Sequence, residues 1–249
     1  MRTGRPAGSA RRPRPVIRRV VTTRAGGASA PPYDTFNLGR SVGDDPAAVR
    51  ANQSRLADQI GLPPERLVWM RMVHGAGVTV VDAPQAEPVP GTDGLVTAQP
   101  DLALVVDVAD CVPVLLADDH AGVVGAVHAG RPGAAAGVVP AAVAAMVRLG
   151  ARVDRIDALL GPAICGACYE VPPAMQADVE SALPGSACRT RQGTAGLDLR
   201  AGISRQLADA GVPTIAVDPA CTYEDPRFYS YRAERVTGRF AGLVWITSR

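Results

Sequence analysis

Three side chains that can bind a metal stand beside short apolar runs of the sequence. His74 and His128 each follow directly on such a run, and Cys111 comes three residues after another. If these runs are strands, their ends beside small residues leave room for a ligand. Two imidazoles and one thiolate are the ligands of a catalytic zinc site that keeps its fourth position open. Their spacing matches no local zinc motif, so an ordinary buried cysteine remains an alternative at this point.

Three other features are weaker candidates for a site. Segment 127–133 leads from an expected strand into an expected helix, whose start near Gly133 could hold an anion, although a plain turn explains it equally well. Cys165 and Cys168 have the spacing of a redox or metal-binding pair, but no second pair accompanies them, so we expect an ordinary turn. His120 is expected to be an exposed turn residue.

The composition is that of a globular chain. Its 249 residues are 47% hydrophobic and 20% charged, and a chain of this length buries roughly 70–75% of its unfolded surface. All 26 basic residues are arginine, and seven of them lie in residues 1–19, which contain no acid. We expect residues 1–19 to be a disordered Arg-rich leader and 20–249 to be a single catalytic domain. The leader has no interleaved aromatics and no amphipathic pattern, so neither nucleic acid nor membrane is an expected partner.

The expected location follows from what the sequence lacks. No segment has the apolar length of a signal peptide or a membrane span. The five cysteines are an odd number, which argues against a disulfide framework. We therefore expect a protein of the reducing cytoplasm.

The hydrophobic periodicity predicts many short strands and a few helices. Asp45 and Pro46 are typical of a helix start, and Gly61 of a helix end. Further helices are expected at 134–149, 173–183 and 198–210, and strands at 67–73 and 78–81 (as a pair), 102–108, 112–117, 123–127, 158–160, 214–217 and 242–246. Strands often follow one another directly, which favours an α/β (α+β) layered sandwich with mixed β-sheets.

Several short motifs occur in an order that resembles one known family. The motifs are Phe36-Asn37-Leu38-Gly39, Val42-Gly43-Asp44-Asp45, Val73-His74-Gly75, Thr92-Asp93-Gly94-Leu95-Val96-Thr97, Ala109-Asp110-Cys111-Val112-Pro113-Val114, Val127-His128-Ala129-Gly130, Gly161-Pro162 and Tyr169-Glu170-Val171. In this order they are similar to the YfiH family, also called the laccase-domain, polyphenol oxidase or peptidoglycan editing factor family. The resemblance runs from about Thr22 to Trp245. It implies a single layered α/β domain and a zinc site whose ligands are His74, Cys111 and His128.

The chain departs from this family at two positions. Where the family usually has Trp-Arg-Gly after His-Ala-Gly, this chain has Arg131-Pro132-Gly133, and Met72 stands where the family often has Gln. Both changes border the expected pocket, so they bear on substrate affinity more than on metal binding.

The resemblance implies several activities, which chemistry can rank. Family members are linked to phosphorolysis of adenosine, inosine, guanosine and methylthioadenosine, to adenosine deamination, to phenol oxidation and to cell-wall precursor editing. Multicopper oxidation needs many imidazoles, and this chain has only three histidines, so laccase activity is not expected. An open zinc site suits deamination, because zinc makes water a nucleophile near neutral pH. Zinc is therefore the expected cofactor, with copper less favoured.

Phosphorolysis also needs residues that hold phosphate and nucleoside. We expect Arg24 and the helix start at Gly133 to bind phosphate and Asn37 to bind the nucleoside, although an ion-pair role for Arg24 and a turn cap for Asn37 remain open. Asp110 is expected to orient a ligating imidazole, with a turn role as its alternative. Arg232 and Arg239 are further anion contacts that the sequence cannot separate from solvated arginines.

Two other classes of function remain open. One is a metal-free cysteine hydrolase or amidase that acts on a cell-wall precursor, with Cys111 as nucleophile and His128 as base. The other is a non-catalytic binding module whose pocket has changed at Arg131-Pro132. For the enzyme, the expected partners are a purine nucleoside and phosphate, and the chain is expected to be a monomer or a weak homo-oligomer.

Overall fold

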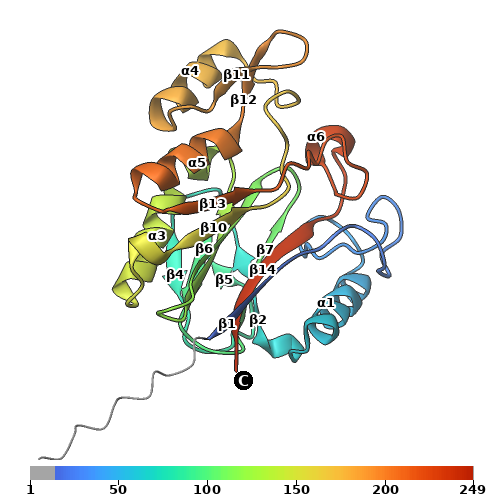
Figure 1. Ribbon diagram of the computed structural model, residues 1–249. Coiled ribbons are helices and arrows are strands. Elements are labelled where there is room, and N and C mark those ends of the chain that lie inside the picture. The colour runs from blue at the N-terminus through green and yellow to red at the C-terminus, as the bar shows by residue number, and fades with distance from the viewer. Residues whose placement is uncertain (1–14, 249) are drawn as a thin grey trace, which may run out of the picture.

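Two β-sheets packed face to face form the centre of the molecule (Figure 1), as the computed structural model of residues 15–248 shows. The four-stranded sheet has the order β1 (Val16–Val21), β14 (Phe240–Thr247), β7 (Ala103–Val108) and β2 (Leu67–Val68). The six-stranded sheet has the order β13 (Thr214–Val217), β10 (Asp157–Leu160), β8 (Val112–Asp118), β9 (Val123–Ala129), β6 (Gly94–Thr97) and β4 (Val78–Val80). Both sheets combine parallel and antiparallel pairs, which confirms the predicted mixed-sheet sandwich.

Helices cover the outer faces of the two sheets. The helices are α1 (Pro46–Ile60), α2 (Arg131–Ala135), α3 (Val138–Arg148), α4 (Pro173–Ala182), α5 (Leu199–Asp209) and α6 (Tyr231–Glu234), with 3-10 turns at Pro64–Arg66 and Val153–Arg155. Two small strand pairs join β3 (Met70–Arg71) to β5 (Val89–Pro90) and β11 (Ala187–Arg189) to β12 (Ala195–Leu197). Figure 1 shows α3 and α5 on the side of the six-stranded sheet and α1 on the side of the four-stranded sheet.

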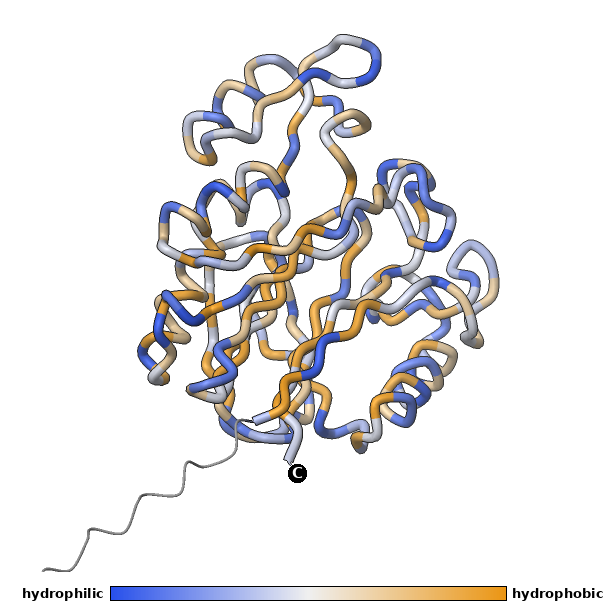
Figure 2. Tube along the Cα trace, viewed as in Figure 1, coloured by the Kyte–Doolittle hydropathy of each residue, from blue (hydrophilic) through white to orange (hydrophobic). Residues whose placement is uncertain are grey.

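Alternation along the strands explains this layering. On β8, Val114 and Leu116 pack toward the helices, whereas Leu115 and Ala117 pack toward the second sheet. The central strands are correspondingly mostly apolar, with Arg18 and Arg19 on the outer strand β1 as an exception, and most polar residues lie on the helices and loops (Figure 2). Each Val or Leu buried in this way contributes roughly 1.5–3 kcal/mol. The central strands are thus rigid supports for the residues at their ends.

Helix α1 forms where the sequence predicts it. The Asp45 carboxylate accepts a hydrogen bond from the Ala47 N–H, and Pro46 occupies the first helical position. Gly61 ends the helix with a φ of 71°, a left-handed conformation that favours glycine. Both ends of α1 can therefore be predicted from local sequence alone.

Three sequence-based predictions are wrong in detail. Segments 67–73 and 78–81 do not pair with each other: β2 pairs with β7, β3 with β5 and β4 with β6. The helix expected at 134–149 is two helices, because Gly137 adopts a φ of 83° between α2 and α3. Strand β9 continues to Ala129, so His128 lies inside it.

The chain is ordered earlier than the predicted leader boundary at residue 19. Strand β1 begins at Val16 and pairs along its length with β14, so residues 16–19 belong to the sheet. The Arg19 guanidinium also forms an ion pair with Asp157. Residues 1–14 of the predicted leader lie outside the described residues. Within residues 15–248, no helix combines the length and apolar character required to cross a membrane.

Candidate active site

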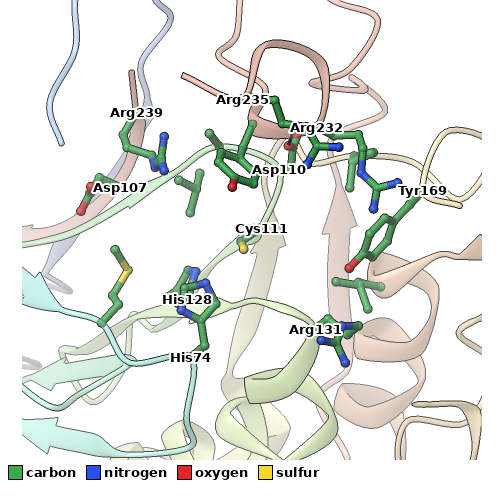
Figure 3. A pocket seen from close by; sticks show the side chains of 16 residues that line it. His74, Asp107, Asp110, Cys111, His128, Arg131, Tyr169, Arg232, Arg235 and Arg239 are labelled. Atoms are coloured by element: carbon green, nitrogen blue, oxygen red, sulfur yellow. Dashed lines mark hydrogen bonds between the residues drawn. The ribbon is translucent and has the colours of Figure 1, made fainter. Parts of the chain in front are cut away.

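A cavity of about 410 Å³ opens at the ends of the central strands, and His74, Cys111 and His128 share one of its walls (Figure 3). One ligand atom from each of the three lies within 4.8 Å of the others. The two imidazole rings meet edge to face at 88°, with centroids 4.7 Å apart. The structure therefore brings together the three residues that the sequence singles out. They fit one metal ion with a fourth position toward the cavity, and they do not fit a multicopper centre.

Three different elements deliver these side chains. His128 is the penultimate residue of β9, Cys111 lies in the turn between β7 and β8, and His74 lies in the loop after β3. His74 and Asp110, the residue before Cys111, have φ values of 58° and 83°. Both backbone conformations are uncommon for residues other than glycine. A Cβ on Gly130 would lie 3.0 Å from His74 Cδ2 and 3.1 Å from Cys111 Sγ, so only glycine lets the chain pass this close.

The carboxylate of Asp93 holds the His128 ring and the backbone of the His74 loop in place. His128 Nδ1 donates to Asp93 Oδ1 at 2.9 Å, which leaves Nε2 for a ligand. The same carboxylate accepts the backbone N–H groups of His74 at 2.9 Å and Gly75 at 2.8 Å. Asp93 is fully buried. The sequence analysis missed this role, although Asp93 stands in the Thr92-Asp93-Gly94 motif.

Asp110 has a different role from the predicted one. It contacts no imidazole; it accepts hydrogen bonds from Thr222 Oγ1 at 2.7 Å, Ser230 Oγ at 2.7 Å and the Arg232 N–H at 2.6 Å. These bonds fix the start of α6 against the Cys111 turn. The carboxylate that orients the imidazole is Asp93, which directly precedes β6, the strand that pairs with β9, and whose carbonyl accepts the His128 N–H at 2.7 Å.

Charge in this cluster favours a thiolate. Burial would raise the pKa of Cys111, but the His128 charge and hydrogen bonds from both imidazoles lower it to about 6. Burial disfavours protonated His128, but the Cys111 thiolate and the Asp93 carboxylate raise its pKa to about 10. A thiolate is the form of cysteine that binds metal or attacks an electrophile.

Arginines line the wall opposite the imidazoles. Arg131, Arg232, Arg235 and Arg239 all border the cavity. Figure 3 shows Arg232, Arg235 and Arg239 above Cys111, across from the imidazoles, and Arg131 below Cys111 at the level of His74. The Arg232 guanidinium lies over the Tyr169 ring at 5.0 Å and donates to the Glu170 carbonyl at 3.0 Å. Several guanidinium groups in one concave site are suited to a phosphate or another anion. Of these four, the sequence analysis named Arg232 and Arg239 as anion contacts.

The structure does not bring Arg24 or Asn37 into the cavity. Arg24 pairs with Glu234 at 2.7 Å and lies over the Tyr229 ring at 4.6 Å. Asn37 is buried, and its Oδ1 accepts the N–H groups of Gly39 at 2.9 Å and Arg239 at 2.8 Å. Asn37 therefore positions the arginine that lines the site.

The expected anion position at Gly133 is also displaced. Helix α2 begins at Arg131 and is five residues long, so Gly133 lies inside it. A Cβ on Gly133 would lie 2.6 Å from the Gly75 carbonyl oxygen, so this glycine permits the close approach of the His74 loop. The two departures from the family pattern, Met72 and Arg131, both border the cavity.

Asp107 is a second acid that the sequence analysis did not identify. It lies on β7 in the wall between this cavity and a neighbouring one of 320 Å³. Burial raises the pKa of Asp107, although Arg239 opposes the change. A raised pKa favours the neutral form of a carboxyl group, and the neutral form can donate a proton to a substrate.

The fold and site define a family of enzymes. Residues 18–247 match the family model described as multi-copper polyphenol oxidoreductase laccase, so the chain belongs to that family. A solved structure of YlmD from Geobacillus stearothermophilus superposes with a TM-score of 0.88 at 34% identity, covering 93% of this chain and 92% of that one. The Bacillus licheniformis protein YfiH superposes with a TM-score of 0.86 at 30% identity, covering 93% of each chain. These matches confirm the YfiH-like fold.

Relatives in actinobacteria carry a more specific name. A purine nucleoside phosphorylase of Mycobacterium tuberculosis is 62% identical over 230 residues, which are 92% of each chain. One from Corynebacterium glutamicum is 57% identical over 232 residues, covering 92% of this chain and 94% of that one. The resemblance seen in the sequence is thus confirmed, as is the expectation of an enzyme.

Proposed function

We propose that this protein is a zinc-dependent purine nucleoside phosphorylase that also deaminates adenosine. The observation that carries the proposal is the pairing of His74, Cys111 and His128 with an arginine-lined wall across a single cavity. The cavity volume of 410 Å³ is in the range of small-molecule sites. The names of the mycobacterial and corynebacterial relatives support the choice of purine nucleosides.

In phosphorolysis, the chain's own residues would bind, orient and supply a proton. Arg232 and Arg239 would hold phosphate so that one of its oxygens forms the new bond to C1′ of the sugar. The C1′–N9 bond breaks, and the purine leaves with the electron pair, which a proton must neutralise. Asp107 is placed to donate this proton, because it borders the cavity and burial favours its neutral form.

Deamination would use the opposite wall. A zinc ion held by the three ligands supplies Lewis acidity and makes water a nucleophile near neutral pH. Asp93 would keep His128 in the tautomer that presents Nε2 to the ion. The water that attacks adenosine would thus be bound at the metal wall, and phosphate would be bound at the arginine wall. Tyr169 and Ile164 would be apolar contacts for the purine.

A nucleoside screen tests this proposal. Purified protein should convert adenosine and inosine to free base and ribose 1-phosphate only when phosphate is present, and adenosine to inosine without it. Adding a strong zinc chelator should abolish deamination, and readdition of zinc should restore it. Turnover of no purine nucleoside by the zinc-loaded protein would refute the proposal.

A metal-free cysteine hydrolase acting on a cell-wall precursor is the second candidate. It is favoured by the lowered pKa of Cys111, about 6, beside His128, whose raised pKa lets it hold the proton that the thiol gives up. In that case the metal-free enzyme would be active on amide substrates, and Cys111 alkylation would abolish the activity. Amide hydrolysis that requires no metal would decide for this alternative.

A further inference from the structure

A second cluster of metal-binding side chains lies outside the cavity. Sγ atoms of Cys165, Cys168 and Cys221 and a carboxylate oxygen of Glu224 all lie within 4.8 Å of one another. In a tetrahedral site with Zn–S bonds of about 2.3 Å, neighbouring ligand atoms stand roughly 3.8 Å apart. The four groups therefore need only small side-chain adjustments to enclose one ion.

Two turns of the same spacing supply the four ligands. Cys165 and Cys168 are separated by two residues, and so are Cys221 and Glu224. In each turn the fourth residue donates its N–H to the carbonyl of the first, at 3.0 Å in both cases. The chain thus contains the second pair that the sequence analysis did not find, because its last member is a glutamate.

Backbone contacts lock the two turns together. Ala163 forms a parallel bridge with Cys221, and the Thr222 N–H donates to the Ala163 carbonyl at 3.2 Å. The Cys165 N–H points to Cys221 Sγ at 3.3 Å. N–H groups directed at sulfur are the outer contacts that stabilise metal-bound thiolates.

An arginine offsets the negative charge of this ligand set. Three thiolates and a carboxylate around a divalent ion leave a net negative charge. Arg191 contacts Glu224 Oε1 at 2.6 Å, and its backbone N–H donates to the Ala167 carbonyl in the first turn at 3.0 Å. Arg191 is therefore fixed to one turn and paired with the other.

We propose that Cys165, Cys168, Cys221 and Glu224 form a second, structural metal site that binds zinc. Soft thiolates select zinc over the hard cations, and four protein ligands close the coordination sphere. A disulfide explains the cluster less well, because one of the three thiols would be left over. The ion would join the loop that carries Ile164 and Tyr169 to the loop whose Thr222 holds Asp110.

Metal content and spectroscopy test the second site. Protein purified with reductant and dialysed against metal-free buffer should hold two zinc ions per chain. Cys111→Ser should hold one, Cys168→Ser should hold one, and the double variant none. Cys188→Ser is the matched control: Cys188 Sγ contacts the Gly166 carbonyl at 3.5 Å but lies outside the ligand set, so both ions should remain.

Cobalt distinguishes the two sites without relying on activity. Cobalt-loaded Cys111→Ser should keep an intense sulfur-to-cobalt charge-transfer band from three thiolates, and Cys168→Ser should lose most of it. Should Cys168→Ser not fold, Glu224→Gln is the milder variant, and cobalt should bind it at least tenfold more weakly than wild type.

Three results would overturn the second site. One is equal metal content in wild type and Cys168→Ser, another is unchanged cobalt affinity in Glu224→Gln, and the third is a disulfide among the three cysteines in protein isolated with reductant. The outcomes also separate this site from the catalytic proposal. If only the catalytic proposal fails, wild type holds one ion, which Cys111→Ser keeps and Cys168→Ser loses.

Discussion

The two cysteine-containing clusters use similar side chains in opposite ways. The proposed catalytic cluster of His74, Cys111 and His128 faces a cavity and offers three ligands, which leaves room for a reacting molecule. The second cluster offers four ligands from two interlocked turns and borders no part of that cavity. If both proposals hold, ligand number and access, more than ligand type, separate the reactive metal site from the structural one.

The largest expected difference is that a substitution in the first cluster lowers activity, whereas one in the second lowers thermal stability. Cys111→Ser removes a thiolate from the open site, so kcat/KM for adenosine deamination should fall by about a thousandfold or more, roughly 4 kcal/mol, with little change in Tm. Cys168→Ser should lower Tm clearly and keep kcat/KM within about tenfold. Steady-state kinetics and thermal unfolding of both variants measure the split. If Cys111→Ser and Cys168→Ser change kcat/KM and Tm to the same extent, the two clusters do not have different roles.

Replacing the buried support of the open site should have the next largest effect. Asp93→Asn keeps the shape but weakens the acceptor for His128 Nδ1, so zinc affinity and activity should fall by about 10- to 100-fold. Competition with a chromogenic chelator measures the affinity. Asp110→Asn is the control, because Asp110 contacts Thr222, Ser230 and Arg232, and its zinc affinity should stay within about threefold of wild type. If the two variants lose zinc alike, Asp93 has no special role.

Alkylation of metal-free protein should separate the clusters by pH. The imidazoles lower the pKa of Cys111 to about 6, so its thiolate is present above that pH. Burial and the neighbouring Cys165 raise the pKa of Cys168 above its usual range, so Cys168 stays a thiol at neutral pH. At pH 7, iodoacetamide should modify Cys111 at least about tenfold faster, and the Cys111 rate should fall below pH 6. Peptide mapping by mass spectrometry gives both rates, and faster modification of Cys168 would contradict the assignment.

The sequence predicted the candidate metal ligands better than the residues that hold those ligands in place. His74, Cys111 and His128 were identifiable because each type has few members or a distinct place beside a strand. Asp93 was not, because its partner His128 is 35 positions away and only the pairing of β6 with β9 brings them together. The sequence predicted Arg24 as a phosphate contact and did not point to Arg131 or Arg235, because nothing local distinguishes one arginine from another. Local signals such as Asp45 and Gly61 predicted α1, whereas the strand pairing of segment 67–81 depends on the whole sheet.

The smallest expected effect concerns the arginine wall, and it tests the division of labour within the open site. Arg239→Ala removes a guanidinium that borders the cavity, so the KM for phosphate should rise by about tenfold, roughly 1.4 kcal/mol. Deamination of adenosine needs no phosphate, so it should change by less than about threefold. Arg24→Ala is the matched control, because Arg24 pairs with Glu234 and stacks on Tyr229 outside the cavity wall. That variant should leave the KM for phosphate unchanged and cost about 0.5–1 kcal/mol of stability. A rise in phosphate KM for Arg24→Ala with none for Arg239→Ala would show that phosphate binds near Glu234, and the arginine wall would then have to serve another anion.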